Sequence, residues 1–327
     1  MRRMTKVDDS AILLRLVVLS WSMAVFADPA PPATAPVAAP ARPYPTAHDA
    51  PLKPTQSFVG RTATYTQYRV EFNGIRGDRV PGYLYVPNDR RTRHPAALVQ
   101  YGTGGHKGVN YIVALDQIFV SHGFVVLTID APMRGERRPP AEAARPPQGR
   151  SIVSALAASI VQNLKDAADN GGRFPQYCGD YSRAIDYLVT RPEVDPSRIG
   201  YCGISWGAIT GITFAAHDPR VKAVVSMVGG GNFLGTLPAN LTENVSDISR
   251  QIDPVYHVAL IAPRPLLFIN VLHDQLVPRF FAESLHKAAG AGAKVMWMDT
   301  DHFFHGTDYL ELGTSVVKFL DENLPKR

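Results

Sequence analysis

One serine of this sequence has the spacing of a nucleophile. Of the 16 serines, only Ser205 has glycine two positions before it and two positions after it, in the string GISWG. An apolar run at 199–202 precedes this string, and a segment of helical period, 208–216, follows it. So sharp a turn between a strand and a helix requires minimal side chains on both sides, and it exposes the serine hydroxyl. The pattern predicts a nucleophile in preference to an ordinary turn serine.

Two later residues have the types that would activate this serine. A hydroxyl is a poor nucleophile near neutral pH unless an imidazole takes its proton and a carboxylate orients the imidazole. Asp274 lies 69 residues after Ser205, and His302 lies 28 residues after Asp274. Each of them follows an apolar, strand-like run, and the chain order Ser, Asp, His is the one that this architecture requires. We expect His302 to be the base and Asp274 to orient it.

A second histidine, His305, is the alternative base. His302 is favoured because it comes first after the apolar run, and because Phe303 and Phe304 can shield its ring from water. Asp301, His302 and His305 also have the donor atoms of a metal site. No further ligands cluster with them, so no metal is expected.

A glycine-rich loop follows the run at 96–100 and can supply backbone donors. The tetrahedral intermediate of acyl transfer needs two donors aimed at its negative oxygen. One expected donor is the N–H of Trp206, the residue after the nucleophile, and the other is the N–H of Thr103, with Gly102 as the neighbouring possibility. A phosphate loop is the rival interpretation, but its Lys-Ser/Thr ending and the G-x-G-x-x-G spacing are both absent.

The elements that must position these residues alternate along the chain. Six short apolar runs are typical of strands buried on both faces: 96–100, 124–129, 199–202, 223–227, 265–270 and 294–298. Segments of helical period lie between or after them: 111–121, 152–168, 181–190 (with Asp180 as a cap), 208–216, 279–289 and 310–324. Alternating segments at 62–72 and 80–86 predict an N-terminal antiparallel hairpin. The predicted class is α/β, with a mostly parallel twisted sheet, helices on both faces, and a site beyond the carboxyl ends of the strands.

Composition excludes several classes of protein. The 327 residues are 45% hydrophobic, which is too apolar for a disordered chain. The net charge of +5 is too small an excess to argue for binding nucleic acid or an anionic membrane. Only two cysteines are present, so a disulfide scaffold is excluded. Cys178 and Cys202 are expected to be free buried thiols, with a disulfide between them as the alternative.

The N-terminal part of the chain has the features of an export signal. A basic start precedes an uncharged apolar run, 16–27, which is too short to span a bilayer and ends in the cleavage-type string VFA. We expect a signal peptide at 1–27, a Pro/Ala-rich linker at 28–54 and a catalytic domain at 55–327. The mature protein is then secreted or periplasmic, without a stable membrane anchor.

The motifs together resemble the α/β-hydrolase superfamily, in particular its dienelactone-hydrolase-like and acetyl xylan esterase (cephalosporin deacetylase)-like members. The resemblance runs from about Val80 to the C-terminus and includes the strings DAPMRGER at 130–137, DYSRAIDYL at 180–188, 195–207, DPRVKA at 218–223 and DHFF at 301–304. It implies the α/β-hydrolase fold and a serine carboxylesterase that needs no cofactor. Ser205, Asp274 and His302 fall on the triad positions of the family.

The substrate is less clearly indicated by the sequence. Tyr101 and Phe303 are expected to line an aromatic pocket for a small-molecule or glycan ester with a short acyl group. Residues 134–150 carry five Arg and two Glu, which indicates either a solvated loop or a cationic rim for an acidic substrate. Two other functions stay open: a prolyl-oligopeptidase-like peptidase, and a non-catalytic binding protein with this fold. The oligomeric state is not indicated.

Overall fold

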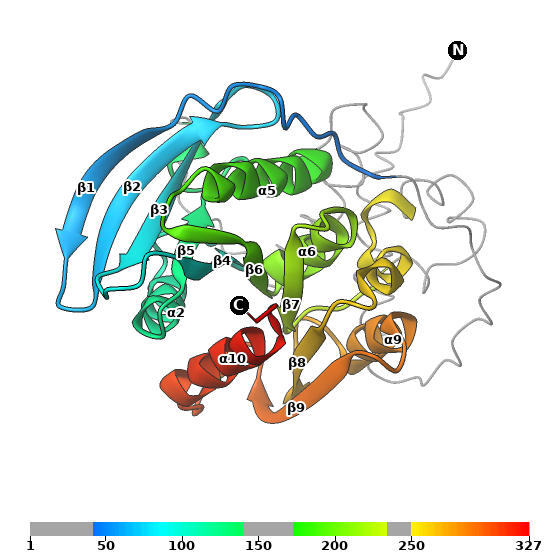
Figure 1. The fold of residues 1–327 in the computed structure, drawn as a ribbon. Coiled ribbons are helices and arrows are strands. Elements are labelled where there is room, and N and C mark those ends of the chain that lie inside the picture. Colours follow the sequence, from blue (N-terminus) through cyan, green and yellow to red (C-terminus); the bar gives the residue numbers. More distant parts are fainter. Residues whose placement is uncertain (1–41, 140–172, 234–249, 327) are drawn as a thin grey trace, which may run out of the picture.

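The computed structural model describes residues 42–139, 173–233 and 250–326, in which the strands form one nine-stranded sheet (Figure 1). The order across the sheet is β1-β2-β3-β5-β4-β6-β7-β8-β9. The bounds are β1 Thr55–Arg61, β2 Tyr65–Asn73, β3 Arg79–Pro87, β4 His94–Gln100, β5 Val125–Ile129, β6 Val194–Ile204, β7 Val221–Met227, β8 Leu266–His273 and β9 Lys294–Asp301. The pairs β5-β4, β4-β6, β6-β7, β7-β8 and β8-β9 are parallel, while β5 pairs antiparallel with β3. All six apolar runs become strands, but the expectation that 294–298 is buried on both faces is wrong: β9 lies at the edge of the sheet, and four of its eight residues are exposed.

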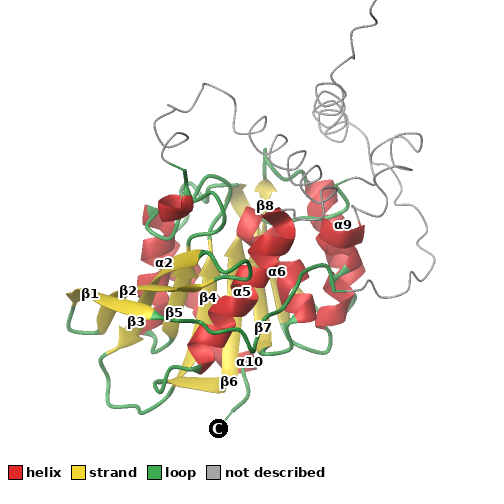
Figure 2. Ribbon diagram, turned by 90° about the horizontal axis from the view of Figure 1, so that it is seen from above, coloured by secondary structure: helices red, strands yellow, loops and turns green. Residues whose placement is uncertain are grey.

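The N-terminal end of the sheet is antiparallel. β2 pairs with β3 from Tyr65 opposite Pro87 to Asn73 opposite Arg79, which confirms the expected hairpin. β1 extends it by a further antiparallel strand that no sequence pattern indicates. Six of the seven residues of β1 are exposed, so burial does not select an apolar face there. β1 and β2 project beyond the helices, as both ribbon views show (Figures 1 and 2).

Helices cover both faces of the parallel part of the sheet. α2 (Asn110–Ser121) and α10 (Tyr309–Asn323) lie together on one face, and α5 (Arg173–Val189), α6 (Trp206–His217) and α9 (Arg279–Ala289) lie on the other (Figure 1). Short 3₁₀ turns lie at η1 (Gly135–Arg137), η2 (Pro254–Tyr256) and η3 (Val258–Ile261). The predicted layers are therefore confirmed. Within the described ranges, none of these helices combines the length and the apolar character needed to cross a membrane.

α5 starts earlier than its sequence pattern predicts. It begins at Arg173 within the described residues, so Asp180 lies inside the helix and the expectation that it caps the helix is wrong. The Asp180 carboxylate instead accepts hydrogen bonds from the Ile75 N–H at 2.8 Å and from the Arg137 guanidinium at 2.8 Å. The presence of an aspartate at 180 is therefore explained by its buried ion pair with Arg137, and not by a helix terminus. The helix expected at 152–168 lies outside the described residues.

The last part of the expected linker packs against the domain. Tyr44 is buried, and its hydroxyl donates to the carbonyl oxygen of Phe214 at 2.8 Å. The guanidinium of Arg183, on α5, donates to the carbonyl oxygens of Ala47 at 2.7 Å and Ala50 at 2.8 Å. The boundary expected at residue 54 therefore falls within packed structure. The expected signal peptide lies outside the described residues.

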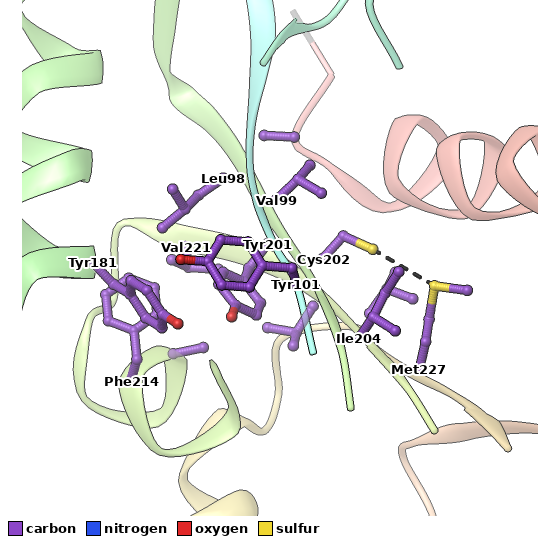
Figure 3. Close-up of a cluster of buried hydrophobic side chains, with 14 of the residues drawn as sticks. Leu98, Val99, Tyr101, Tyr181, Tyr201, Cys202, Ile204, Phe214, Val221 and Met227 are labelled. Carbon is purple, nitrogen blue, oxygen red and sulfur yellow. Dashed lines mark hydrogen bonds between the residues drawn. The ribbon is translucent and has the colours of Figure 1, made fainter. Parts of the chain in front are cut away.

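The two cysteines lie on opposite faces of the sheet. Cys202, on β6, lies in the apolar core with its Sγ 3.9 Å from the Sδ of Met227 (Figure 3). Successive side chains of a strand alternate between faces, so the neighbouring Tyr201 points toward α5 and α6. Cys178, on α5, lies on that second face, where its Sγ contacts the carbonyl oxygen of Thr210. Both thiols are free and buried, because the sheet separates them.

Candidate active site

Ser205 occupies a strained turn between β6 and α6. β6 ends at Ile204 and α6 begins at Trp206, and the intervening serine has φ 53° and ψ −112°. Such a conformation is costly for a residue with a side chain and occurs mainly at functional sites. The flanking glycines make the turn possible: a Cβ on Gly203 would collide with the Gly207 backbone, and one on Gly207 would lie 2.7 Å from the Gln100 carbonyl oxygen.

His302 and Asp274 meet at this serine. The Nε2 of His302 lies 3.0 Å from the Ser205 Oγ, and the Nδ1 of His302 lies 2.8 and 2.9 Å from the two Asp274 carboxylate oxygens. A carboxylate only accepts hydrogen bonds, so the neutral ring carries its proton on Nδ1 and presents an unprotonated Nε2 to the serine. The side chains of His302 and Asp274 are only 6% and 4% exposed. The three predicted residues thus form one continuous hydrogen-bonded chain.

The loop after β8 fixes the Asp274 carboxylate. Its Oδ1 accepts hydrogen bonds from the backbone N–H groups of Leu276 and Val277, both at 2.8 Å. These donors fix the orientation of the carboxylate. The acid is therefore positioned before any substrate arrives.

The alternative base, His305, does not reach the serine. Its ring is 76% exposed, and its Nδ1 lies 2.7 Å from the Oδ2 of Asp301. Phe304, in the turn between the two histidines, has φ 58°, and the chain reverses there. His302 therefore faces inward and His305 outward. Over the described ranges, no three His, Cys, Asp or Glu side chains converge as metal ligands.

Two of the three proposed backbone donors are available to an oxyanion. Trp206 is the first residue of α6, so its N–H has no partner within the helix. Among the backbone hydrogen bonds of the described residues, none uses the N–H of Thr103. The N–H of Gly102, by contrast, donates to the Tyr111 hydroxyl at 2.9 Å, so this alternative donor is already occupied. Gly102 instead leaves room for the nucleophile, because a Cβ on Gly102 would lie only 3.1 Å from the Ser205 Cβ.

The two residues expected to contact substrate differ in accessibility. Tyr101 is buried, its hydroxyl accepts a hydrogen bond from the Ala131 N–H at 2.7 Å, and its carbonyl oxygen accepts one from the Gly207 N–H. It therefore supports the turn, and the expectation that it contacts substrate is replaced by a structural role. Phe303 is 53% exposed and lies edge-on to the His302 ring, with the centroids 5.6 Å apart.

A charged cluster behind the glycine loop, in which Lys107 and Asp130 are buried and Glu136 is exposed, was not anticipated from the sequence. The Nζ of Lys107, in that loop, lies 2.6 Å from Asp130 and 2.5 Å from Glu136, and its backbone N–H also donates to Asp130. The hydrogen bond from Arg69, followed by the contact with Lys107, lowers the pKa of Glu136 to about 2. Asp130 and Glu136 belong to the string at 130–137, and the signal that could have identified the cluster was a lysine within a glycine-rich loop.

Of the three described arginines at the start of the arginine-rich segment, Arg138 is exposed and Arg137 is not available to a cationic rim. The side chain of Arg137 is only 7% exposed and pairs with Asp78 and Asp180. Its charge is therefore used within the fold. Residues 140–150 of this segment lie outside the described ranges.

Known proteins resemble this chain in sequence and in fold. Residues 48–235 match the model of the acetyl xylan esterase family (AXE1). A curated relative, "Putative hydrolase YtaP" of Bacillus subtilis, is 26% identical over 66% of this chain and 74% of its own length. The acetyl xylan esterase of Paenibacillus sp. R4 has a similar fold, with a TM-score of 0.65 at 19% identity over 99% of this chain and 97% of its own. That of Thermoanaerobacterium sp. JW/SL YS485 also scores 0.65, at 18% identity over 94% of each chain.

Proposed function

The chain belongs to the acetyl xylan esterase family and is a carboxylic ester hydrolase, and from this premise we propose that it cleaves short-chain esters through an acyl-enzyme on Ser205. The observation that carries the proposal is the 3.0 Å approach of the His302 Nε2 to the Ser205 Oγ, with Asp274 on the other ring nitrogen. Nucleophile, base and orienting acid are the three side chains that acyl transfer by a serine requires.

The reaction follows from these contacts. The Ser205 Oγ attacks the ester carbonyl while the His302 Nε2 takes its proton, and the Asp274 carboxylate stabilises the resulting imidazolium. The negative oxygen of the tetrahedral intermediate accepts hydrogen bonds from the N–H groups of Trp206 and Thr103. His302 then gives the proton to the leaving alcohol oxygen as the C–O bond breaks. A water molecule, deprotonated by the same Nε2, then attacks the acyl carbon. The bond between that carbon and the Ser205 Oγ breaks, the carboxylic acid leaves, and the proton returns from Nε2 to the Ser205 Oγ.

The exposed ring of Phe303 favours a cyclic leaving group. The leaving oxygen must lie near the His302 Nε2 to receive its proton, so the alcohol part of the ester lies on the His302 side of the site. Phe303 adjoins that ring and is half exposed. An aromatic face there can pack against the apolar face of a sugar or against an aryl group. Together with the family, this supports acetyl groups on carbohydrate as substrates.

The test is labelling by a fluorophosphonate probe combined with turnover. The wild-type protein should bind the probe covalently and hydrolyse p-nitrophenyl acetate, whereas Ser205→Ala should do neither. Ser226→Ala is the matched control, since Ser226 lies on β7 and is buried. Faster turnover of aminoacyl anilides than of esters would instead identify a peptidase, and an unlabelled wild-type protein would identify a non-catalytic member of the fold.

Export of the chain is a second part of the proposal. The basic start, the short apolar run at 16–27 and the string VFA support removal of a signal peptide. When the full-length chain is produced in a bacterial host, the N-terminus of the exported protein should be Asp28. Recovery of the protein only in the cytoplasm, with Met1 intact, would contradict this.

A further inference from the structure

The loop that carries the Thr103 N–H is built from residues that do not hold a fixed shape by themselves. Three of its glycines lie at 102, 104 and 105, and Gly104 has φ +83°. A donor to an oxyanion stabilises the transition state only if it is already in place, because reorganisation during the reaction removes the benefit. Within the loop, the Gly105 N–H donates to the Gly102 carbonyl oxygen at 3.1 Å, and contacts from outside the loop fix its two ends.

Tyr111 makes such a contact at the start of the loop. Its Oη accepts the Gly102 N–H at 2.9 Å, from the first turn of α2. The carbonyl oxygen of Tyr111 in turn accepts a hydrogen bond from the hydroxyl of Tyr309 at 3.0 Å, and Tyr309 is the first residue of α10. Burial raises the pKa of the Tyr111 hydroxyl, so it stays neutral at working pH. The acceptor is thus held by two packed helices.

Lys107 fixes the other end of the same loop. Its backbone N–H and its Nζ both bind the Asp130 carboxylate, at 3.0 and 2.6 Å. Asp130 is completely buried, at the end of β5. The segment between Gly102 and Lys107 is therefore held at both ends, with the free N–H of Thr103 directly after the Tyr111 contact.

We propose that Tyr111 is a positioning residue for catalysis, which by binding the Gly102 N–H directs the next N–H, that of Thr103, toward the carbonyl oxygen of the substrate. The inference rests on the function proposed above. Without the tyrosine hydroxyl, the peptide between Tyr101 and Gly102, which directly precedes the one that carries the Thr103 N–H, loses one of its two hydrogen bonds and keeps the one from the Gly207 N–H to the Tyr101 carbonyl oxygen. Tyr111 does not touch the reacting atoms, so its effect is on the height of the barrier and not on the binding of the ester.

The test compares Tyr111→Phe with Tyr65→Phe. The control, Tyr65→Phe, removes the hydroxyl of a residue of β2 that accepts a hydrogen bond from Gln117. Gln117 lies on α2, as Tyr111 does, but away from the glycine loop. For Tyr111→Phe, the second-order rate constant for labelling by the fluorophosphonate and kcat for p-nitrophenyl acetate should both fall about 10-fold, with KM changed less than about 2-fold. Hydrogen exchange in the peptide covering 101–109 should become faster. Tyr65→Phe should change none of these.

The outcomes separate the two proposals. If the wild-type protein is not labelled, the proposed function is wrong, whatever Tyr111 does. If it is labelled and Tyr111→Phe reacts at the wild-type rate, the positioning role is wrong and the proposed function stands. The role is also overturned if Tyr65→Phe loses the same factor, or if KM rises while kcat is unchanged.

Discussion

The Nε2 of His302 lies 3.0 Å from the Oγ of Ser205, although 97 residues separate them along the chain. The serine belongs to the turn after β6, and the histidine to the turn after β9, on the far side of β7 and β8. Parallel strands bring their carboxyl ends to one edge of a sheet, which is how distant residues meet there. The side chain of Asp274, after β8, completes the chain of hydrogen bonds.

His302→Ala should reduce kcat for p-nitrophenyl acetate by at least about 10³-fold, because the serine loses its proton acceptor. The matched change His305→Ala, three residues away, should alter kcat by less than about 3-fold, since its exposed ring binds Asp301. Steady-state kinetics of both variants with p-nitrophenyl acetate measures the two changes in kcat. A larger loss for His305→Ala than for His302→Ala would reverse the identity of the base.

Asp274→Asn should lower kcat by about 10³-fold or more while leaving the fold intact, because an amide can donate to Nδ1 and so favours the wrong tautomer of His302. The protein contains a natural control. Asp299 lies 2.8 Å from the Nε2 of His273, and both side chains are mostly exposed. Asp299→Asn should leave kcat at the wild-type value. Equal losses in the two variants would show that the charge alone, and not the orientation of His302, is responsible.

Arg183→Met should destabilise the protein by about 2–3 kcal/mol, since Asp186 and the carbonyl oxygens of Ala47 and Ala50 lose a buried donor, while Arg220 still pairs with Asp186. The reference variant is Arg279→Met, whose guanidinium is 61% exposed and pairs with Glu283 on the surface. That change should cost less than about 1 kcal/mol. Urea unfolding measures both; similar midpoints would mean that the contacts of residues 47–50 with α5 contribute nothing to stability.

Acid should destabilise the fold through His257. Burial, and then the neighbouring His217, lower the pKa of His257 to about 4. Above about pH 6.5 both the folded and the unfolded states are neutral at this residue. As the pH falls from about 6.5 to 4, only the unfolded state takes up the proton, and the free energy of unfolding decreases by about 3 kcal/mol. Below pH 4 this contribution no longer changes.

Unfolding by urea at several pH values measures that contribution. His257→Gln, which cannot titrate, should show a shallower loss of stability over this interval than the wild-type protein. His273→Gln, at an exposed histidine, should keep the wild-type slope. An unchanged slope in His257→Gln would rule out this residue as the source of the acid sensitivity.

The sequence predicted those features for which only one type of residue fits the position. Ser205 was predictable because only glycine fits at 203 and 207, and β4 to β8 because buried strands require apolar runs. β9 also has an apolar run, but it lies at the edge of the sheet and is largely exposed. The role of Asp180 was predicted wrongly because an aspartate can either cap a helix or form a buried ion pair, and here it pairs with Arg137. The role of Tyr111 could not be predicted, since it depends on where α2 lies relative to the loop. Lys107 could be noticed as a lysine within a glycine-rich loop, but its partner Asp130 could not be predicted.

The separation of Cys178 from Cys202 by the sheet has a consequence for how the protein is made. Burial raises the pKa of both thiols well above the usual range, so neither is a reactive thiolate. Because the two cysteines form no disulfide, neither a thiol oxidase nor a disulfide isomerase is required for the chain to mature. The same native molecule should form in glutathione-rich cytosol and in an oxidising medium, and dithiothreitol should leave its melting curve unaltered.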